Sequence, residues 1–418
     1  MNNLQNIDER IYRYVFSGDN DVKKNLACEI KEEGASKGIK LASIHNLYMA
    51  FGNKEVSGFT VPAFNIRTMT YDTARIIFSV AKENNIGPFI FEIARSEMNY
   101  TRQDPEEYVT AIIAAAIKEN YQGPVFIQGD HFQFKNSVFK TDPQTEINNI
   151  KDLINRSIEA GFYNIDIDAS TLVDLTKTDL DEQQKNNYRM TALITKHIRS
   201  IEPKGITVSV GGEIGHIGGK NSTVGDFEAF MEGYLKEIAN HKLQITKGIS
   251  KVSVQTGTSH GGVPLPDGTI AKVNLDFEVL QTVTKVAREK YRIGGSVQHG
   301  ASTLPNELFY RFPEKNTLEI HLATGFQNIV YQYMPKKLRE EIYQWIKNNL
   351  KNEWKTELNE EQFIYKTRKK ALGVFKEKIW KMTDDEKKPI RENLKKQFTF
   401  LFEKLGVFNT KTVISRYL

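Results

Sequence analysis

The stretch V-F-I-Q-G-D-H at residues 125–131 decides the fold, because a short apolar run ends in a carboxylate and an imidazole. A run of this length next to glycine predicts a buried strand with polar side chains at its carboxyl end. Similar runs recur along the chain after residue 60. The eight expected strands span residues 61–66, 88–94, 125–130, 164–169, 206–213, 251–256, 294–298 and 318–323.

Helical segments separate these strands, at residues 71–84, 105–120, 145–160, 181–201, 226–241 and 276–290. Alternating strand and helix units of this number favour a (β/α)8 barrel, whose active site is built from the loops after the carboxyl ends of the strands. An open doubly wound sheet is the competing architecture, but it gathers four non-adjacent strand ends around one point less readily. We therefore predict an α/β fold with a (β/α)8 TIM barrel at residues 61–333.

Both ends of the chain lie outside the predicted barrel, since about 250 residues suffice for this fold and the chain has 418. We expect an N-terminal helical extension at residues 1–60, with helices at 7–16, 22–37 and 43–53. A C-terminal helical extension is expected at residues 334–418. It carries 21 Lys and Arg against 12 Asp and Glu. Because the acidic residues are interleaved, this charge indicates a solvated helical face or an oligomer arm rather than a nucleic-acid site.

The composition is typical of a soluble cytoplasmic enzyme. Hydrophobic residues make up 39% of the chain and the mean hydropathy is −0.46. No apolar run approaches the roughly 18 residues of a membrane span, and no basic region followed by an apolar core marks a signal peptide. A lone Cys28 excludes an internal disulfide. We expect a homo-oligomer that acts on a small molecule, without nucleic-acid or membrane partners.

Four polar residues stand in glycine-rich turns at the ends of the third, fifth, sixth and seventh predicted strands: His131, Glu213, His260 and His299. Three imidazoles and a carboxylate are typical ligands of Zn²⁺, and an open coordination position would remain for a substrate oxygen. Each histidine alone is more often a hydrogen-bonded structural residue, and Glu213 alone could pair with a lysine. Their joint placement at strand ends favours one site for a divalent metal.

A series of short motifs resembles the zinc-dependent class II fructose-bisphosphate aldolases, in the same order along the chain. The motifs are V-P-A-F-N at 61–65, G-D-H at 129–131, I-D-A-S at 167–170, G-E-I-G-H-I-G-G at 212–219, G-T-S-H-G at 257–261 and H-G-A-S at 299–302. The resemblance covers roughly residues 60–330. A more distant similarity, through the G-D-H-F turn, joins the tagatose-bisphosphate aldolase accessory subunits and sugar-acid epimerases of the same superfamily.

The resemblance implies a set of catalytic roles. His131, His260 and His299 would bind the catalytic Zn²⁺ or another divalent metal, and Glu213 would also approach it. Cleaving a ketose between C3 and C4 leaves a carbanion that such a metal can hold as an enediolate. Asp130 would handle the proton of the C4 hydroxyl. Adjacent side chains at a strand end diverge, so we expect Asp130 to face the substrate while its neighbour faces the metal.

The resemblance also implies contacts with the sugar and its phosphate, at Asn65, Gly219, Gly261, Gly300, Ser302 and Thr324. Glycine amides and hydroxyl groups are suited to an anion, although glycines also serve tight turns without binding anything. His216 is more consistent with a loop residue than with a ligand. Asp168 shares a strand face with Asp166, and a supporting role behind the metal ligands is expected for it.

Two departures from the aldolase pattern bear on the substrate. Where the family offers a serine to one phosphate, the chain has Ala94 followed by Arg95, whose guanidinium could take over if it turned inward. Where the family has an amide, His321 supplies an imidazole that can also exchange protons. Three interpretations follow: an aldolase acting on a ketose phosphate similar to fructose or tagatose bisphosphate, an epimerase of a ketose or sugar acid, or a non-catalytic partner of a tagatose-bisphosphate aldolase.

Overall fold

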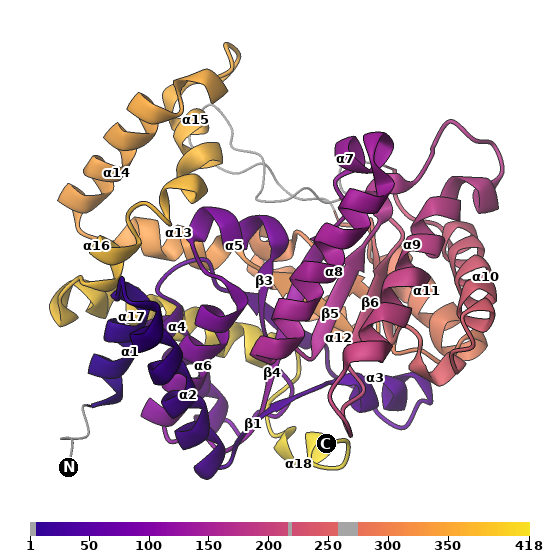
Figure 1. Cartoon of the computed structure of the whole chain (residues 1–418), viewed down its shortest axis with the longest axis horizontal. Coiled ribbons are helices and arrows are strands. Elements are labelled where there is room, and N and C mark those ends of the chain that lie inside the picture. Colours follow the sequence, from indigo (N-terminus) through magenta and orange to yellow (C-terminus); the bar gives the residue numbers. More distant parts are fainter. Residues whose placement is uncertain (1–5, 216–219, 258–274) are drawn as a thin grey trace.

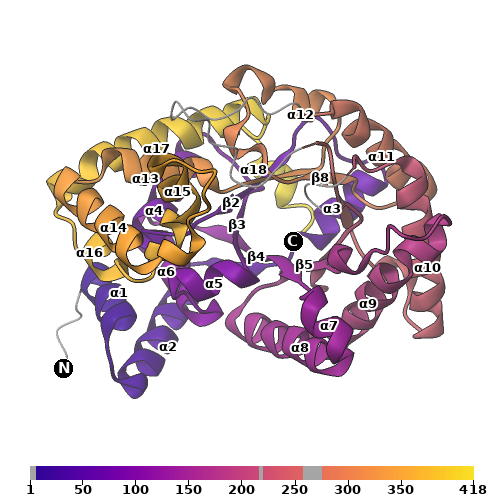
Figure 2. The same ribbon diagram turned by 90° about the horizontal axis from the view of Figure 1, so that it is seen from above.

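The computed structural model describes residues 6–215, 220–257 and 275–418. Its centre is a closed barrel of eight parallel strands, as predicted (Figures 1 and 2). Neighbouring strands pair in chain order, and β9 returns to pair with β2 through Val61 and Glu319. The barrel strands are β2 (Val61–Asn65), β3 (Ile90–Ala94), β4 (Gly123–Gln133), β5 (Asn164–Asp168), β6 (Ser209–Glu213), β7 (Lys251–Val254), β8 (Ser296–Gln298) and β9 (Glu319–Leu322).

Helices surround the strands, and each predicted helix is present (Figure 2). They are α4 (Thr70–Glu83), α6 (Pro105–Lys118), α8 (Pro143–Ala160), α9 (Leu180–Ile201), α10 (Val224–Asn240) and α11 (Phe277–Lys290), with α13 (Thr324–Tyr333) after the last strand. Their starts follow capping rules: Asp104 and Asp142 cap α6 and α8, each with proline in the first turn. Four of the described α-helices of the barrel were not predicted: α13 and the shorter α5 (Arg95–Thr101), α7 (Asn136–Thr141) and α12 (Arg311–Glu314).

The barrel interior contains a buried charged network. The Nζ atom of Lys251 lies 2.9 Å from Asp166 and 2.5 Å from Glu319, and it donates to Gln128 at 2.7 Å. These four side chains come from four different strands and are buried. A buried ammonium requires such compensation, because charge removed from water is costly unless it is paired and hydrogen-bonded.

The N-terminal extension adds a strand to the expected helices. It consists of α1 (Ile7–Phe16), α2 (Asn20–Ser36), β1 (Ile39–Ala42) and α3 (His45–Gly52). β1 pairs in parallel with the first half of β4, from Gly123 to Phe126, whereas β5 pairs with the second half from Gln128. The prediction of a purely helical extension was therefore incomplete.

The C-terminal extension is helical, as predicted, and packs on the barrel (Figure 1). Phe398 and Phe402 contact Phe64 of β2, with ring centroids 5.0 and 5.2 Å away. Thr60, just before β2, donates its backbone N–H to Leu405 at 2.9 Å. No helix in the described ranges is long and apolar enough to cross a membrane. The elements are α14 (Lys336–Asn349), α15 (Glu360–Thr367), the 3₁₀ helix η6 (Arg368–Ala371), α16 (Lys376–Trp380), α17 (Asp384–Lys404) and α18 (Lys411–Ile414).

Candidate active site

A bulge in β4 forms the centre of the site. The pairing of β4 with β5 shifts by one residue between Gly129 and Phe132, and His131 has a φ of 40°. The Phe132 ring packs so closely on Gly129 that a Cβ there would lie under 3.0 Å from it. The extra residue breaks the strict alternation of side chains. Asp130 and His131, which were expected to diverge, therefore line the same cavity.

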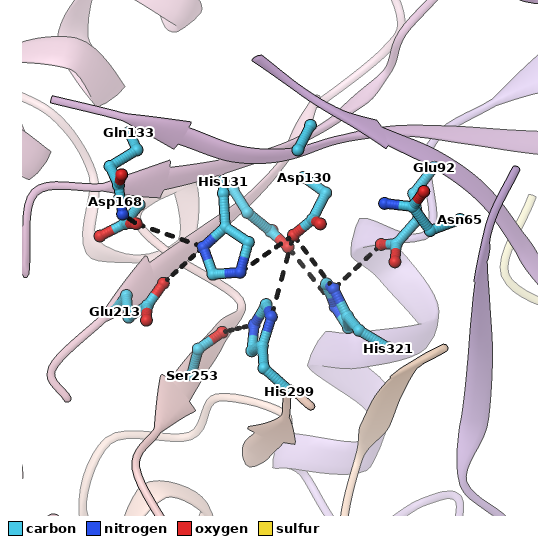
Figure 3. Close-up of polar contacts among 12 residues, drawn as sticks. Asn65, Glu92, Asp130, His131, Gln133, Asp168, Glu213, Ser253, His299 and His321 are labelled. Atoms are coloured by element: carbon cyan, nitrogen blue, oxygen red, sulfur yellow. Dashed lines mark hydrogen bonds and ion pairs between the residues drawn. The ribbon is translucent and has the colours of Figure 1, made fainter. Parts of the chain in front are cut away.

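Carboxylates surround His131 (Figure 3). Its Nδ1 atom lies 3.2 Å from Asp168 at the end of β5 and 3.1 Å from Glu213 at the end of β6. Burial opposes the charged imidazolium, but Asp130 and Glu213 raise the pKa of His131 well above its usual value. Burial, followed by the charge of Asp168, raises the pKa of Glu213 to about 7. The ends of β4, β5 and β6 thus concentrate negative charge around one imidazole.

His299 and His321 bring two further imidazoles to Asp130. The ring centroids of His131 and His299 are 4.2 Å apart, and those of His299 and His321 are 4.0 Å apart. Asp130 Oδ1 lies 3.2 Å from Nδ1 of His321 and 3.9 Å from Nδ1 of His299. His299 is oriented by Ser253, which lies 2.9 Å from its Nε2 atom. One carboxylate therefore faces three imidazoles in a row (Figure 3).

His321 connects this row with the network inside the barrel. Its Nδ1 atom lies 3.0 Å from Glu92 of β3, and its Nε2 atom lies 2.5 Å from Glu319. Burial raises the pKa of Glu92 to about 8, although His321 favours its charged form. Burial acts in the same direction on Glu319, but Lys251 and His321 lower its pKa to about 2. The histidine that replaces the family's amide is thus held by carboxylates on both ring nitrogens.

The donor set fits a divalent cation. The ligand atoms of Asp130, His131 and His299 lie within 4.8 Å of one another, and so do those of His131, Asp168 and Glu213. His131 engages Asp168 through one ring nitrogen, and metal-ligating histidines are usually held in this way. Imidazole and carboxylate are ligands that suit Zn²⁺ and related ions.

A cavity of about 530 Å³ adjoins these side chains, and most of the other predicted residues line it. Asn65 donates to Glu97 at 2.6 Å, and Ser302 accepts from the backbone of Ala323 at 2.7 Å. Arg95 faces the cavity, but its guanidinium pairs with Glu146 at 2.5 Å. The predicted residues lining the cavity are Asn65, Arg95, Asp130, His131, His299, Gly300, Ser302, His321 and Thr324.

Three predicted site residues lie outside the described residues. They are the proposed ligand His260 and the proposed substrate contacts Gly219 and Gly261. Their roles stay predictions.

The lining residues that the sequence did not single out include Glu92, Arg67, Glu97 and Lys369. Glu92 lies inside a strand that is otherwise apolar, and a carboxylate at such a position needs partners inside the barrel; this was the available signal. Arg67 and Glu97 follow β2 and β3, where a barrel places its active-site loops. Lys369 belongs to the C-terminal extension, and no sequence pattern pointed from there to the cavity.

Comparison with known proteins agrees with this fold. A model of the family described as fructose-bisphosphate aldolase class II matches residues 46–388. No curated protein matches the chain. Among solved structures, a fructose-bisphosphate aldolase from Campylobacter jejuni has 16% identity and a TM-score of 0.51, covering 89% of this chain and 96% of its own. A fructuronate-tagaturonate epimerase from Cohnella laeviribosi has 11% identity and a TM-score of 0.57, with coverages of 84% and 82%. A probable tagatose 6 phosphate kinase from Sinorhizobium meliloti 1021 has 12% identity and a TM-score of 0.56, with coverages of 86% and 90%.

Proposed function

Because the chain belongs to the class II fructose-bisphosphate aldolase family, we propose that it is a metal-dependent aldolase that cleaves or forms a ketose phosphate. The observation that carries the proposal is the position of Asp130. Its buried carboxylate lies 3.7 Å from His131 and 3.9 Å from His299, which are two of the proposed metal ligands. The same side chain lines the cavity in which the substrate would bind. A base for the C4 hydroxyl of a ketose must occupy such a place.

The proposed ligands are His131, His260 and His299, with Glu213 as a fourth or alternative ligand. A bound divalent cation, Zn²⁺ or a similar ion, would supply Lewis-acid stabilisation of the negative charge that develops on the substrate. Asp168 and Ser253 orient the imidazoles through the contacts described above. Asp130 would take the proton from the C4 hydroxyl during cleavage and return it during condensation.

One phosphate would bind beside the last two strands. Gly300 has a φ of 73°, a backbone conformation that glycine adopts without strain, and it lines the cavity with Ser302 and Thr324. At the other end of the substrate the family's serine is replaced by Ala94, and Arg95 is engaged with Glu146. We therefore expect specificity to shift away from fructose 1,6-bisphosphate.

A second candidate function is epimerisation at C4 of a ketose or sugar acid. The observation that favours it is His321, whose Nδ1 atom lies 3.2 Å from Asp130 and 3.0 Å from Glu92. An imidazole in this position can exchange protons, which an amide cannot do. In such a reaction the aldehyde produced by cleavage would rotate before the new carbon–carbon bond formed. Asp130 and His321 would then exchange protons with the C4 oxygen, one on each face of the aldehyde.

A metal titration followed by a substrate screen tests both functions. The metal-loaded protein is incubated with ketose phosphates, free ketoses and sugar acids, and the products are separated. Two smaller carbonyl compounds indicate aldol cleavage, whereas an isomer with the carbon chain intact indicates epimerisation. If the loaded protein converts none of these compounds, both enzymatic proposals are wrong and a non-catalytic partner subunit becomes the better interpretation.

A further inference from the structure

A lysine from the C-terminal extension lies at the rim of the active-site cavity. Lys369 of η6 lines the cavity, and its Nζ atom lies 5.8 Å from the centroid of the Tyr100 ring. Its ammonium group makes neither an ion pair nor a hydrogen bond with any residue that the structure describes. By contrast, Arg95 in the same cavity is paired with Glu146. Lys369 is therefore a cation available to a ligand.

The chain on both sides of Lys369 is fixed to the barrel. The guanidinium of Arg368 donates to Asn328 of α13 at 2.6 Å and packs over the Tyr331 ring, with its Cζ atom 4.9 Å from the centroid. Gly373 donates its backbone N–H to Tyr100 of α5 at 3.0 Å, where a Cβ would lie under 3.0 Å from the Tyr100 oxygen. These contacts hold the backbone of the lysine in place at the cavity rim.

A second cation lies nearby. Arg67, in the loop after β2, pairs with Glu97 at 2.7 Å and approaches Thr324 at 3.5 Å. Desolvation, followed by the charge of Arg67, lowers the pKa of Lys369. Glu97 also accepts hydrogen bonds from Asn65 and from the backbone of Ala94. Glu97 pairs with Arg67 and already has these other donors, and it forms no ion pair with Lys369. An anion that contacted both cations would therefore be favoured.

We propose that Lys369, together with Arg67, binds the anionic group at the substrate end remote from the metal ligands, so that the C-terminal extension selects substrates with a terminal phosphate or carboxylate. The inference rests on the proposed function of the same cavity. It explains how the cavity recognises a charged terminus although the family's serine is replaced by Ala94 and Arg95 is engaged elsewhere. Phosphate and carboxylate share the chemistry that an ammonium and a guanidinium recognise.

Three ketoses that differ only at C6 separate the two anions. D-fructose carries a neutral hydroxymethyl group there, D-fructose 6-phosphate a phosphate and D-fructuronate a carboxylate. The dissociation constant of each is measured by calorimetry with the metal-loaded full chain. We expect the wild-type protein to bind one or both anionic ketoses more tightly than fructose, and the tighter of the two identifies the anion.

Lys369→Met should weaken binding of the preferred anionic ketose roughly tenfold or more, since a charge-assisted hydrogen bond is lost, and should leave fructose binding unchanged. Lys369→Arg should retain the preference. The matched control is Lys370→Met. Lys370 is the next residue in the chain, and its exposed side chain pairs with Glu353. Lys135→Met removes another lysine of the same cavity and should have a smaller effect.

The proposal is overturned if the wild-type protein shows no anion preference, if Lys369→Met retains the full preference, or if the control variants lose as much as Lys369→Met. Binding is read separately from turnover. An anion preference that depends on Lys369, without cleavage or epimerisation of any ketose, contradicts the proposed function and supports this site. Active cleavage with no anion preference contradicts this site alone.

Discussion

Asp130 lies within 4.0 Å of three imidazoles, so its substitution separates proton transfer from metal binding. We expect Asp130→Asn to retain the metal and to lower turnover by roughly 10²- to 10⁴-fold, the usual scale of general acid–base catalysis. Elemental analysis and steady-state rates on the active ketose check this. Loss of the metal in the variant would instead make Asp130 a ligand.

Substitution of Asp168 should instead weaken metal binding. Its carboxylate lies 3.2 Å from Nδ1 of His131 and also accepts from Gln133 and Ser170. Because such a partner fixes the orientation and basicity of a ligand, Asp168→Asn should weaken metal affinity by about 10- to 100-fold. Competition with a chelator of known affinity measures the change. Unaltered affinity would mean that His131 is oriented by Glu213 alone or does not bind the metal.

Among the elements, β4 has the most specific local requirement, since Gly129 leaves room for the Phe132 ring. Gly129→Ala should destabilise the fold by about 1–3 kcal/mol through overpacking and should weaken metal binding by disturbing the bulge. Gly18→Ala is the matched control, because no atom lies within 4 Å of the added methyl group. Urea unfolding compares the two variants.

Gly129→Ala combined with Phe132→Leu should recover part of the lost stability, because the smaller side chain relieves the close contact. If the double variant is no more stable than Gly129→Ala, the Phe132 ring is not the source of the strain.

The elements that could be predicted from the sequence are those with a strong pattern. The barrel strands are apolar runs next to turns, and parallel pairing follows from their alternation with helices. β1 was missed because I-K-L-A at residues 39–42 is short and its last three side chains are not buried. α5 was missed because its seven residues directly follow β3 and show no clear apolar period. Short elements of this kind depend on tertiary contacts that local sequence does not record.

The part of the candidate site that lies at strand ends could be predicted from the sequence. This part consists of Asp130, His131, Glu213 and His299, which the structure brings together. The convergence of Asp130 with its neighbour could not be predicted, because it depends on a bulge that only the register with β5 reveals. Lys369 could not be found either, since its place at the cavity follows from the packing of η6 on α5 and α13.

At the scale of the whole molecule, ion pairs that include a buried one between α17 and α4 join the C-terminal extension to the barrel. Lys387 of α17 lies 2.9 Å from Asp72 of α4, and both side chains are buried. Among the described residues, Lys387→Met leaves Asp72 with only the more distant Arg391, at 3.7 Å, and should destabilise the protein by about 3 kcal/mol, the lower end of the range for a broken buried pair. Lys388→Met, at an exposed position, is the control. Urea or thermal unfolding measures the loss, and adding Asp72→Asn should restore part of it.

The contribution of this pair should persist at neutral pH. Burial opposes the charge of Lys387, but Asp72 raises its pKa above the ordinary value of 10.5. A cation with a raised folded pKa stabilises the fold fully below its unfolded pKa and loses this effect as the pH rises through the folded value. The difference between wild type and Lys387→Met should therefore be constant from neutral pH to about pH 9 and shrink only above pH 10.5. A decline that began near pH 7 would contradict the assignment.

The pairing of β2 with β9, and of Thr60 with Leu405, has a consequence for synthesis on the ribosome. The first barrel strand receives these neighbours only after β9 and then α17 and Leu405 have been translated. Until then β2 has an open edge, and Phe64 lacks the aromatic partners that α17 brings. Unpaired edges and exposed apolar surface promote aggregation. The nascent chain should therefore depend on chaperones until α17 and Leu405 have emerged.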